Sequence, residues 1–438
     1  MRRRDLLSTS LAAGVTAAIA RRAAAQPTTV PAPTAPAPTA PAPTAPPSTA
    51  ARPGGPSVIA PNGRVDRGRV VGGARVFHLV AEPITHEVAP GLTIETWGYG
   101  GGTPGPVLEA TEGERIRVYV TNRLPEVTTV HWHGLVLPNG QDGVAGLTQR
   151  AIPPGETWRY EFPLTRAGTF LYHPHVDEMT QIALGMVGMI VVHPRRPAAA
   201  TRRVRDYALM AHEWKIVPGA RRPDPLAMTD FNQLVWNGKA FPATAPLVAA
   251  TGDLVRIRIG NLGPMDGHPI HLHGHHMTVV ETDGGPVPPG ARWPETTVQV
   301  PVGTVRVVEF VADQPGDWPL HCHMTHHVMN QMGHDVPNLI GADVTGLDRR
   351  IGRLAPGYMT MGHTGMADMM QMPLPANAIS MRGGPGPFGT IDMGGMFTMV
   401  KVRDGLVGDA DPGWYAQPDG SGARAATAAE LAADGIAG

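Results

Sequence analysis

Four short segments of this chain each place two histidines on either side of a single residue. In a β-strand, the side chains of residues i and i+2 leave the same face of the sheet. The spacing therefore predicts four strands that each present two imidazoles together. The pairs are His131 and His133, His173 and His175, His271 and His273, and His321 and His323. Eight imidazoles from four strands can converge on one polynuclear metal centre.

The only cysteine, Cys322, lies between the histidines of the fourth pair, and His327 and Met332 follow it closely. Two imidazoles and a thiolate with a distant thioether form the ligand set of a redox-active copper site. A lone cysteine in an exported protein has no disulfide partner in its own chain. Simple burial of an isolated cysteine is the alternative, but the other histidine clusters favour metal ligation.

Alternation along the fourth strand gives Cys322 a special position. His321 and His323 leave one face of the strand, and Cys322 leaves the other. One strand therefore joins a mononuclear site on one side to a histidine cluster on the other, through only a few covalent bonds.

These motifs, taken in order, resemble the signatures of the multicopper oxidases, the family of laccases and cuprous oxidases. The four signatures are His131-Trp132-His133-Gly134, His173-Pro174-His175, His268-Pro269-Ile270-His271-Leu272-His273-Gly274, and the stretch from His321 through Cys322 and His327 to Met332. The resemblance implies an all-β fold of cupredoxin-like Greek-key β-sandwich domains. It also implies four coppers and the oxidation of a small donor, Cu(I) or a phenol, coupled to the reduction of O₂ to water.

The family's metal ligands can be carried over position by position. A mononuclear blue copper would be held by His268, Cys322 and His327, with Met332 as its axial ligand. His131 and His271 match the ligands of the lone copper in a trinuclear cluster. The coupled pair of coppers would be held by six histidines: His133, His173, His175, His273, His321 and His323.

Two further residues are candidates for proton delivery during O₂ reduction. Asp142, followed by Gly143, occupies the place of a family acid near the trinuclear cluster, although an aspartate before glycine is also a common turn. His326 stands where many relatives carry a glutamate. An imidazole can transfer protons near neutral pH, or it can simply lie at the surface.

The N-terminal end of the chain predicts export. Residues 1–26 carry Arg2-Arg3-Arg4, a weakly apolar stretch and the small residues Ala23-Ala24-Ala25, which is typical of a twin-arginine signal. No later stretch is long and apolar enough to span a bilayer. A periplasmic or secreted location follows. The formal net charge of −1 over 438 residues gives no reason to expect nucleic acid as a partner.

The strand patterns repeat, which predicts a duplicated β-unit. We expect a Pro/Ala/Thr-rich linker over 27–69, a first domain over 70–195, a second over 205–403 and a flexible tail over 404–438. At the offsets of Cys322, His327 and Met332, the first domain carries Pro174, Met179 and Leu184, so it cannot hold a blue copper. Strands are predicted at 114–120, 187–192, 254–259 and 395–402.

A methionine-rich insertion is predicted over 345–392, before the last strand of the second domain. Nearly half of the chain's 21 methionines lie between Met359 and Met399, in a stretch too rich in Gly and Pro for a long helix. Thioethers suit Cu(I), whereas Met-rich core packing is the alternative for its centre. The candidate Cu(I) site comprises Met359, Met361, Met366, Met369, Met370 and Met372.

Other functions fit the pattern less well. A copper nitrite reductase also has two cupredoxin domains, but it needs one copper held by three histidines and not four paired strands. A non-catalytic periplasmic copper-binding protein would not need ligands for four coppers. Since no third domain separates the two halves, the resemblance implies a homotrimer in which the first domain of one chain meets the second domain of the next.

Overall fold

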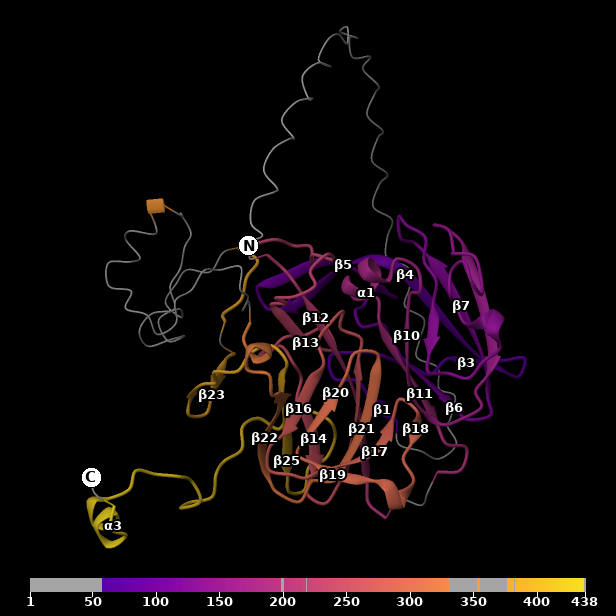
Figure 1. Cartoon of the computed structure of the whole chain (residues 1–438). Helices are drawn as coiled ribbons and strands as arrows, with labels where there is room; N and C mark the ends of the chain where they lie inside the picture. Colours follow the sequence, from indigo (N-terminus) through magenta and orange to yellow (C-terminus); the bar gives the residue numbers. More distant parts are fainter. Residues whose placement is uncertain are drawn as a thin grey trace, which may run out of the picture. The chain divides into compact units, whose positions relative to one another are not determined.

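A computed structural model describes residues 57–197, 201–217, 219–330, 353–354, 376–381 and 383–436 of the chain. These residues form strands almost throughout, with only short helical turns (Figure 1), so the predicted all-β class is confirmed. Four sheets of five or more strands pack in pairs as two β-sandwiches. None of the described helices is long and apolar enough to cross a membrane.

The first sandwich pairs two five-stranded sheets. One has the order β3-β4-β7-β9 with β5 on β4, and the other has the order β2-β6-β11-β10-β8. Alternation in β7 buries Ile116, Val118 and Val120 against the aromatic core around Trp132 and Tyr172. The bounds are β2 Val65–Asp66, β3 Arg69–Val71, β4 Ala74–Ala89, β5 Leu92–Tyr99, β6 Val107–Thr111, β7 Arg115–Asn122, β8 His131–His133, β9 Thr157–Pro163, β10 Gly168–His173 and β11 Gly188–His193.

The second sandwich pairs an eight-stranded sheet with a five-stranded one. The first follows the order β1-β12-β15-β21-β17-β18 with β13 and β19 attached, and the second follows β14-β25-β22-β16-β20. The bounds are β1 Val58–Ile59, β12 Val204–Trp214, β13 Gln233–Trp236, β14 Leu247–Ala250, β15 Leu254–Asn261, β16 His268–Leu272, β17 Met277–Thr282, β18 Gly285–Pro286, β19 Trp293–Glu295, β20 Thr297–Val300, β21 Thr304–Val311, β22 Gly316–Cys322 and β25 Phe397–Arg403.

The predicted internal repeat is visible in the pairing of the strands. In the first sandwich β10 lies between β8 and β11, and β11 runs parallel to β6. In the second, β22 lies between β16 and β25, and β25 runs parallel to β14. Even the entry to the histidine strands matches, because Gly168 and Gly316 have φ of 153° and 154°, where L side chains are strained. The four strands predicted from the sequence are present: β7, β15 and β25 were predicted from alternation and β11 from an apolar run.

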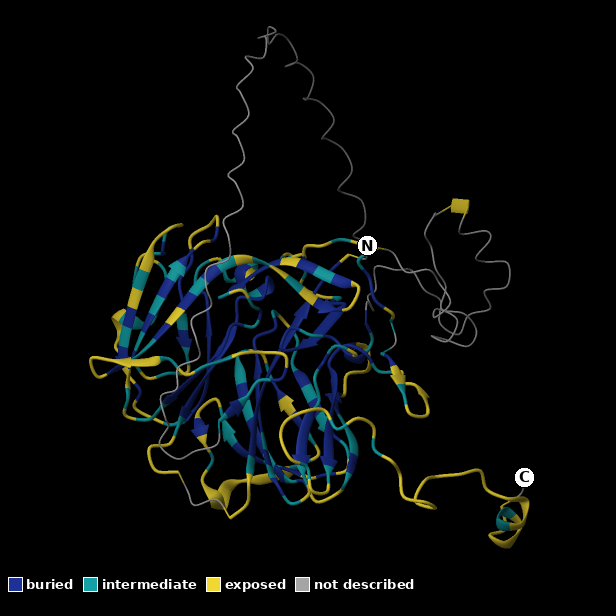
Figure 2. Ribbon diagram, turned by 180° about the vertical axis from the view of Figure 1, so that it is seen from behind, coloured by how far each residue is buried: buried dark blue, intermediate teal, exposed yellow. Residues whose placement is uncertain are grey.

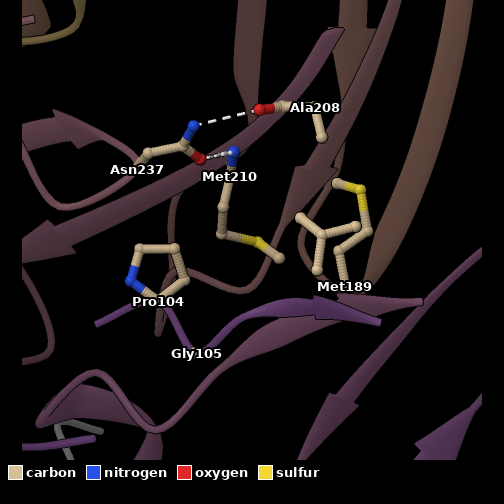
Figure 3. Close-up of a pocket in the computed structure, with 7 residues that line it drawn as sticks. Pro104, Gly105, Met189, Ala208, Met210 and Asn237 are labelled. Atoms are coloured by element: carbon tan, nitrogen blue, oxygen red, sulfur yellow. Dashed lines mark hydrogen bonds between the residues drawn. The ribbon is translucent and has the colours of Figure 1, made fainter. Parts of the chain in front are cut away.

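Within the chain, the sheet that carries β10 and β11 packs its outer face on the second sandwich. Leu171, Met189 and Val191 contact an apolar surface that includes Met210 and Val307. A small pocket at this junction is lined by Pro104, Gly105, Val107, Met189, Ala208, Met210 and Asn237 (Figure 3). The Asn237 amide accepts the Met210 N–H at 2.7 Å and donates to the Ala208 carbonyl at 2.9 Å, so it fixes the turn after β13 against β12 on the second-sandwich side of the pocket.

Two parts of the fold differ from the sequence expectation. Residues 57–69 were assigned to the linker, yet β1 pairs with β12 and β2 pairs with β6, and Val58 is buried. Strands of two residues carry no periodicity that a sequence could reveal. The start of the expected flexible tail is tied to the second sandwich, since Lys401 contacts Asp411 and Arg403 contacts Asp317, which also accepts the Tyr415 N–H.

The remaining elements are short. Burial is concentrated in the strands of both sandwiches, and the chain after β25 is largely exposed (Figure 2). The helical turns and the small hairpin are η1 Asn139–Gln141, α1 Glu178–Ala183, η2 Pro289–Ala291, η3 Thr325–Val328, β23 Pro385–Gly386, β24 Gly389–Thr390 and α3 Ala428–Ala433.

Candidate metal centre

A buried trio of side chains brings two imidazoles and the thiol together. His268 begins β16, Cys322 ends β22, and His327 lies in η3 immediately after that strand. The Nδ1 atoms of His268 and His327 are 3.1 Å apart, and the Cys322 Sγ is 3.8 and 3.4 Å from them. All three side chains are buried. Their donor atoms thus converge on one point, as a mononuclear metal site requires.

The electrostatics of the trio fit a bound cation. Burial raises the pKa of the Cys322 thiol to about 12 and lowers the pKa of His268 to about 3. Burial also lowers the pKa of His327, against the opposing effect of the Asp266 carboxylate. Both imidazoles are therefore neutral and able to donate lone pairs. A soft cation would supply the positive charge that makes a thiolate favourable in this apolar setting.

A first histidine quartet lies at one edge of the first sandwich. His131 and His133 come from β8, His173 ends β10, and His175 follows it. The His133 Nδ1 and the His173 Nε2 are 3.3 Å apart. The His131 ring stands 5.7, 5.3 and 5.4 Å from the rings of His133, His173 and His175. One imidazole thus faces a group of three.

A second quartet repeats this arrangement in the second sandwich. The Nε2 atoms of His273 and His321 are 3.2 Å apart. The His271 ring stands 4.8, 5.7 and 5.3 Å from the rings of His273, His321 and His323. His321 belongs to this quartet while the adjacent Cys322 belongs to the trio. The predicted two-faced strand is therefore present in β22.

Backbone carbonyls orient the imidazoles of both quartets. The Nδ1 of His131 bonds to the Asp142 carbonyl at 2.8 Å, and that of His173 bonds to the Pro174 carbonyl at 2.8 Å. His271 uses the Thr296 carbonyl at 2.8 Å in the same way, and His321 uses the Cys322 carbonyl at 2.9 Å. A ring that donates through Nδ1 presents the lone pair of Nε2 to a metal.

The two quartets do not meet within one chain. Every imidazole of both quartets is among the described residues, and no ring contact joins one quartet to the other. His133 instead lies beside the backbone of Gly303. The junction between the sandwiches uses the outer face of β10 and β11 and the sheet containing β12 and β21, not the sheet that carries β16 and β22.

The remaining residues predicted for the site belong neither to the trio nor to the quartets. Asp142 lies beside the first quartet, with its Oδ1 3.4 Å from the His131 Nδ1. His326 is exposed on η3, next to His327. Met332 and the six methionines of the candidate Cu(I) site fall outside the described residues: Met359, Met361, Met366, Met369, Met370 and Met372.

Two carboxylates near the trio were missed by the sequence analysis. Asp266 places its Oδ2 3.5 Å from the His327 Nε2, and Glu213 places its Oε2 3.7 Å from the His268 Nε2. Burial, together with the Asp266 carboxylate, raises the pKa of Glu213 to about 8. Asp266 could have been noticed two residues before His268. Glu213 lies 55 positions upstream and had no local signal.

Comparisons with known proteins agree with this geometry. Residues 81–197 and residues 218–341 each match a multicopper oxidase family model, and together they cover more than half of the chain. Copper resistance protein A of Escherichia coli is 40% identical over 114 residues, which cover 26% of this chain and 18% of that protein. Multicopper oxidase MmcO of Mycobacterium tuberculosis is 32% identical over 232 residues, or 45% of each chain. The chain thus spans less than half the length of these relatives.

Solved structures cover more of the molecule. The blue copper oxidase from Nitrosomonas europaea superposes with a TM-score of 0.55 at 26% identity, over 75% of this chain and 85% of that one. The multicopper oxidase mgLAC gives a TM-score of 0.56 at 28% identity, over 79% and 90%. The predicted cupredoxin-like β-sandwich class is confirmed, and the chain belongs to the multicopper oxidase family.

Proposed function

We propose that this protein is a copper-dependent oxidase that takes electrons singly from a small donor and uses four of them to reduce O₂ to water. Cu(I) is the favoured donor, and copper tolerance is the favoured role. The observation that carries this proposal is the strand β22, which gives Cys322 to the buried trio and His321 to the second quartet.

The roles of the side chains follow from their positions. His268, Cys322 and His327 would hold a mononuclear copper, and the two quartets would hold a trinuclear cluster. Bound copper would supply reversible one-electron chemistry, which amino-acid side chains lack. Cys322 is joined through the backbone to both His321 and His323, so β22 is a short covalent connection between the two groups of ligands. Asp142, beside His131, would hold a proton for the oxygen site.

In this proposal, each oxygen site forms only where two copies of the chain meet. Each chain offers one quartet on each sandwich, and the two do not meet within the chain. A first quartet must therefore meet the second quartet of another copy. Such a heterologous contact either closes into a ring or continues as a filament, and we propose closure by three copies. We expect a homotrimer with three clusters and four coppers per chain. Analytical ultracentrifugation with copper analysis tests this, and a fully active monomer would overturn it.

The surface outside the trio supports a small cationic donor. Asp266 places its carboxylate 3.5 Å from the His327 Nε2, at the exposed side of the trio. Met265, which precedes Asp266, and Met324, three residues before His327, are 50% and 42% exposed. A carboxylate attracts Cu(I) and thioethers are soft ligands for it. A phenol is the second candidate, because the same carboxylate can accept its O–H.

Oxygen uptake with Cu(I) and with a bulky phenol separates the two donors. We compare the wild type, a deletion of 359–381 and Met265→Leu, with Met228→Leu as a control because Met228 is also exposed. The deletion and Met265→Leu should each lose about tenfold in Cu(I) oxidation and keep phenol oxidation, which is the loss typical when an outer contact to a metal ligand is removed. An unchanged ratio of the two activities would favour a laccase that oxidises phenols.

Location and the remaining alternatives can be tested together. We propose export by the leader with Arg3-Arg4 to the periplasm or the medium. Replacing Arg3 and Arg4 by Lys should leave the protein in the cytoplasm. A non-catalytic copper-binding protein would bind copper without O₂ uptake, and a nitrite reductase would consume nitrite. The two histidine quartets favour neither alternative.

A further inference from the structure

Glu213 is a buried carboxyl that touches both the trio and the loop before it. It lies near the end of β12 and its side chain is fully buried. Its Oε1 accepts the backbone N–H groups of Met265 and Asp266 at 2.7 and 2.8 Å. Its Oε2 is 3.7 Å from the His268 Nε2, and neither of these two buried atoms has a hydrogen-bond partner among the described residues.

We propose that Glu213 is a positioning residue of the mononuclear copper site. Its Oε2 receives the Nε2–H of His268 when that ring binds copper, and its Oε1 fixes the loop that presents Asp266 to His327. This inference rests on the proposed function, because it presumes that the trio holds copper.

The geometry of the trio determines the tautomer of His268 as a copper ligand. Its Nδ1 faces Cys322 and His327, so the proton of the neutral ligand must reside on Nε2. A metal-ligating histidine almost always donates its other N–H to a carboxylate, a carbonyl or water. In the described part of the chain, Glu213 is the carboxyl group nearest to that atom, and a copper ion on the ring would favour its ionised, accepting form. A small closure of the 3.7 Å distance would make the hydrogen bond.

Side-chain hydrogen bonds also fix the loop before His268. Asn261 Oδ1 accepts the Gly263 N–H at 2.9 Å, and its Nδ2 donates to the Asp266 carbonyl at 2.8 Å. Together with the two bonds to Glu213, these contacts fix residues 263–266 immediately before His268.

Both imidazoles of the trio face a carboxylate through Nε2. The partner of His268 is sealed in the core, whereas Asp266 on the His327 side is partly exposed.

Glu213→Gln separates the two roles, because an amide has one acceptor and one donor end. The two backbone N–H groups of the loop will hold the amide oxygen, so the NH₂ faces the Nε2–H of His268. We expect copper affinity at the mononuclear site to fall 10- to 100-fold. Copper in the trinuclear cluster should remain, and the blue absorption and EPR hyperfine splitting should change.

Asp206→Asn is the matched control. Asp206 lies on the same strand, is equally buried, and pairs with Arg258 at 2.7 Å, away from the trio. This variant should lower the melting temperature while copper affinity and spectra stay as in the wild type. If the altered spectra of Glu213→Gln came from a general packing defect, Asp206→Asn would show the same alteration.

Different outcomes would refute the proposed function and the role of Glu213. A wild type without any blue copper signal would refute the proposed function itself. A blue wild type together with a Glu213→Gln variant of unchanged affinity and spectrum would refute this inference alone. If Glu213→Gln does not accumulate, Glu213→Asp replaces it. Its shorter carboxylate cannot reach both the loop and His268, so wild-type affinity and spectrum would again overturn the inference.

Discussion

The two sandwiches share one strand plan but differ after their second pair of histidines. In the second domain, β22 leads through Cys322 into η3, where His327 turns back to the buried thiol. In the first domain, β10 leads through Pro174 into α1, where Met179 is 61% exposed. Both domains keep a histidine quartet, but only one has a thiol and imidazoles on the opposite face of the strand.

The two kinds of site therefore depend on different parts of the fold. Each quartet depends on the ends of two neighbouring strands, an arrangement that both copies of the unit retain. Only β8 carries both histidines of its pair, because His175, His273 and His323 lie just beyond the ends of β10, β16 and β22. The trio also needs a residue from the turn after β22 and a buried partner from the start of β16. A duplicated unit can therefore lose the mononuclear site through a few substitutions and still complete an oxygen site in assembly.

Removal of the thiol should have the largest effect. Cys322→Ser should abolish the blue absorption and reduce O₂ uptake to background, because a hydroxyl is a poor ligand for copper at this kind of site. Copper bound to the quartets should largely remain. Visible spectra and copper analysis measure both. Pro174→Cys in the first domain is the matched addition, and it should create no blue site, since no imidazole follows at position 179. A serine variant that stays blue contradicts the assignment.

The reverse phenotype is expected from the first domain. His133→Ala removes one of the two imidazole nitrogens that stand 3.3 Å apart, so O₂ reduction should fall to background. The blue absorption should persist, because the trio lies wholly in the second domain. Single-turnover reduction of the blue copper by a donor should be normal, whereas its reoxidation by O₂ should fail. Loss of the blue colour here would show that the domains are not independent in this way.

Proton delivery should give an intermediate effect. Asp142→Asn keeps the backbone carbonyl that orients His131 but removes the carboxylate 3.4 Å from that ring. We expect O₂ reduction to slow by roughly 100-fold, the lower range for a proton-transfer group. Blue absorption should be unchanged, and Asp404→Asn, an exposed aspartate beyond β25, serves as the control. A full rate in Asp142→Asn would leave Asp142 as a turn residue only.

The sequence predicted what depends on local periodicity. Alternation located β7, β15 and β25, an apolar run located β11, and the i, i+2 histidines located the strands that carry the quartets. It could not locate Glu213, because only the packing of β12 near the start of β16 brings this residue to His268. Nor could it find β1 and β2, whose two-residue pairings depend on partners far along the chain.

The smallest effect concerns the junction that joins the two domains. His212 is buried between them, with its Nδ1 3.1 Å from the Leu262 carbonyl, and burial lowers its pKa to about 4. An unfolded histidine titrates near 6.5, so the unfolded chain binds a proton that the folded one refuses. The stability due to neutral His212 is therefore complete above pH 6.5 and is lost as the pH falls towards 4. The difference reaches at most about 3 kcal/mol.

Urea unfolding of the metal-free protein between pH 7 and pH 4 measures this loss. His212→Asn cannot titrate, so its stability should fall less steeply with acid than that of the wild type, although other buried histidines contribute equally to both. The steeper wild-type curve would locate part of the acid sensitivity at the contact between the domains. Parallel curves would mean that His212 is protonated as easily in the folded protein as in the unfolded chain, and that the junction is open to water.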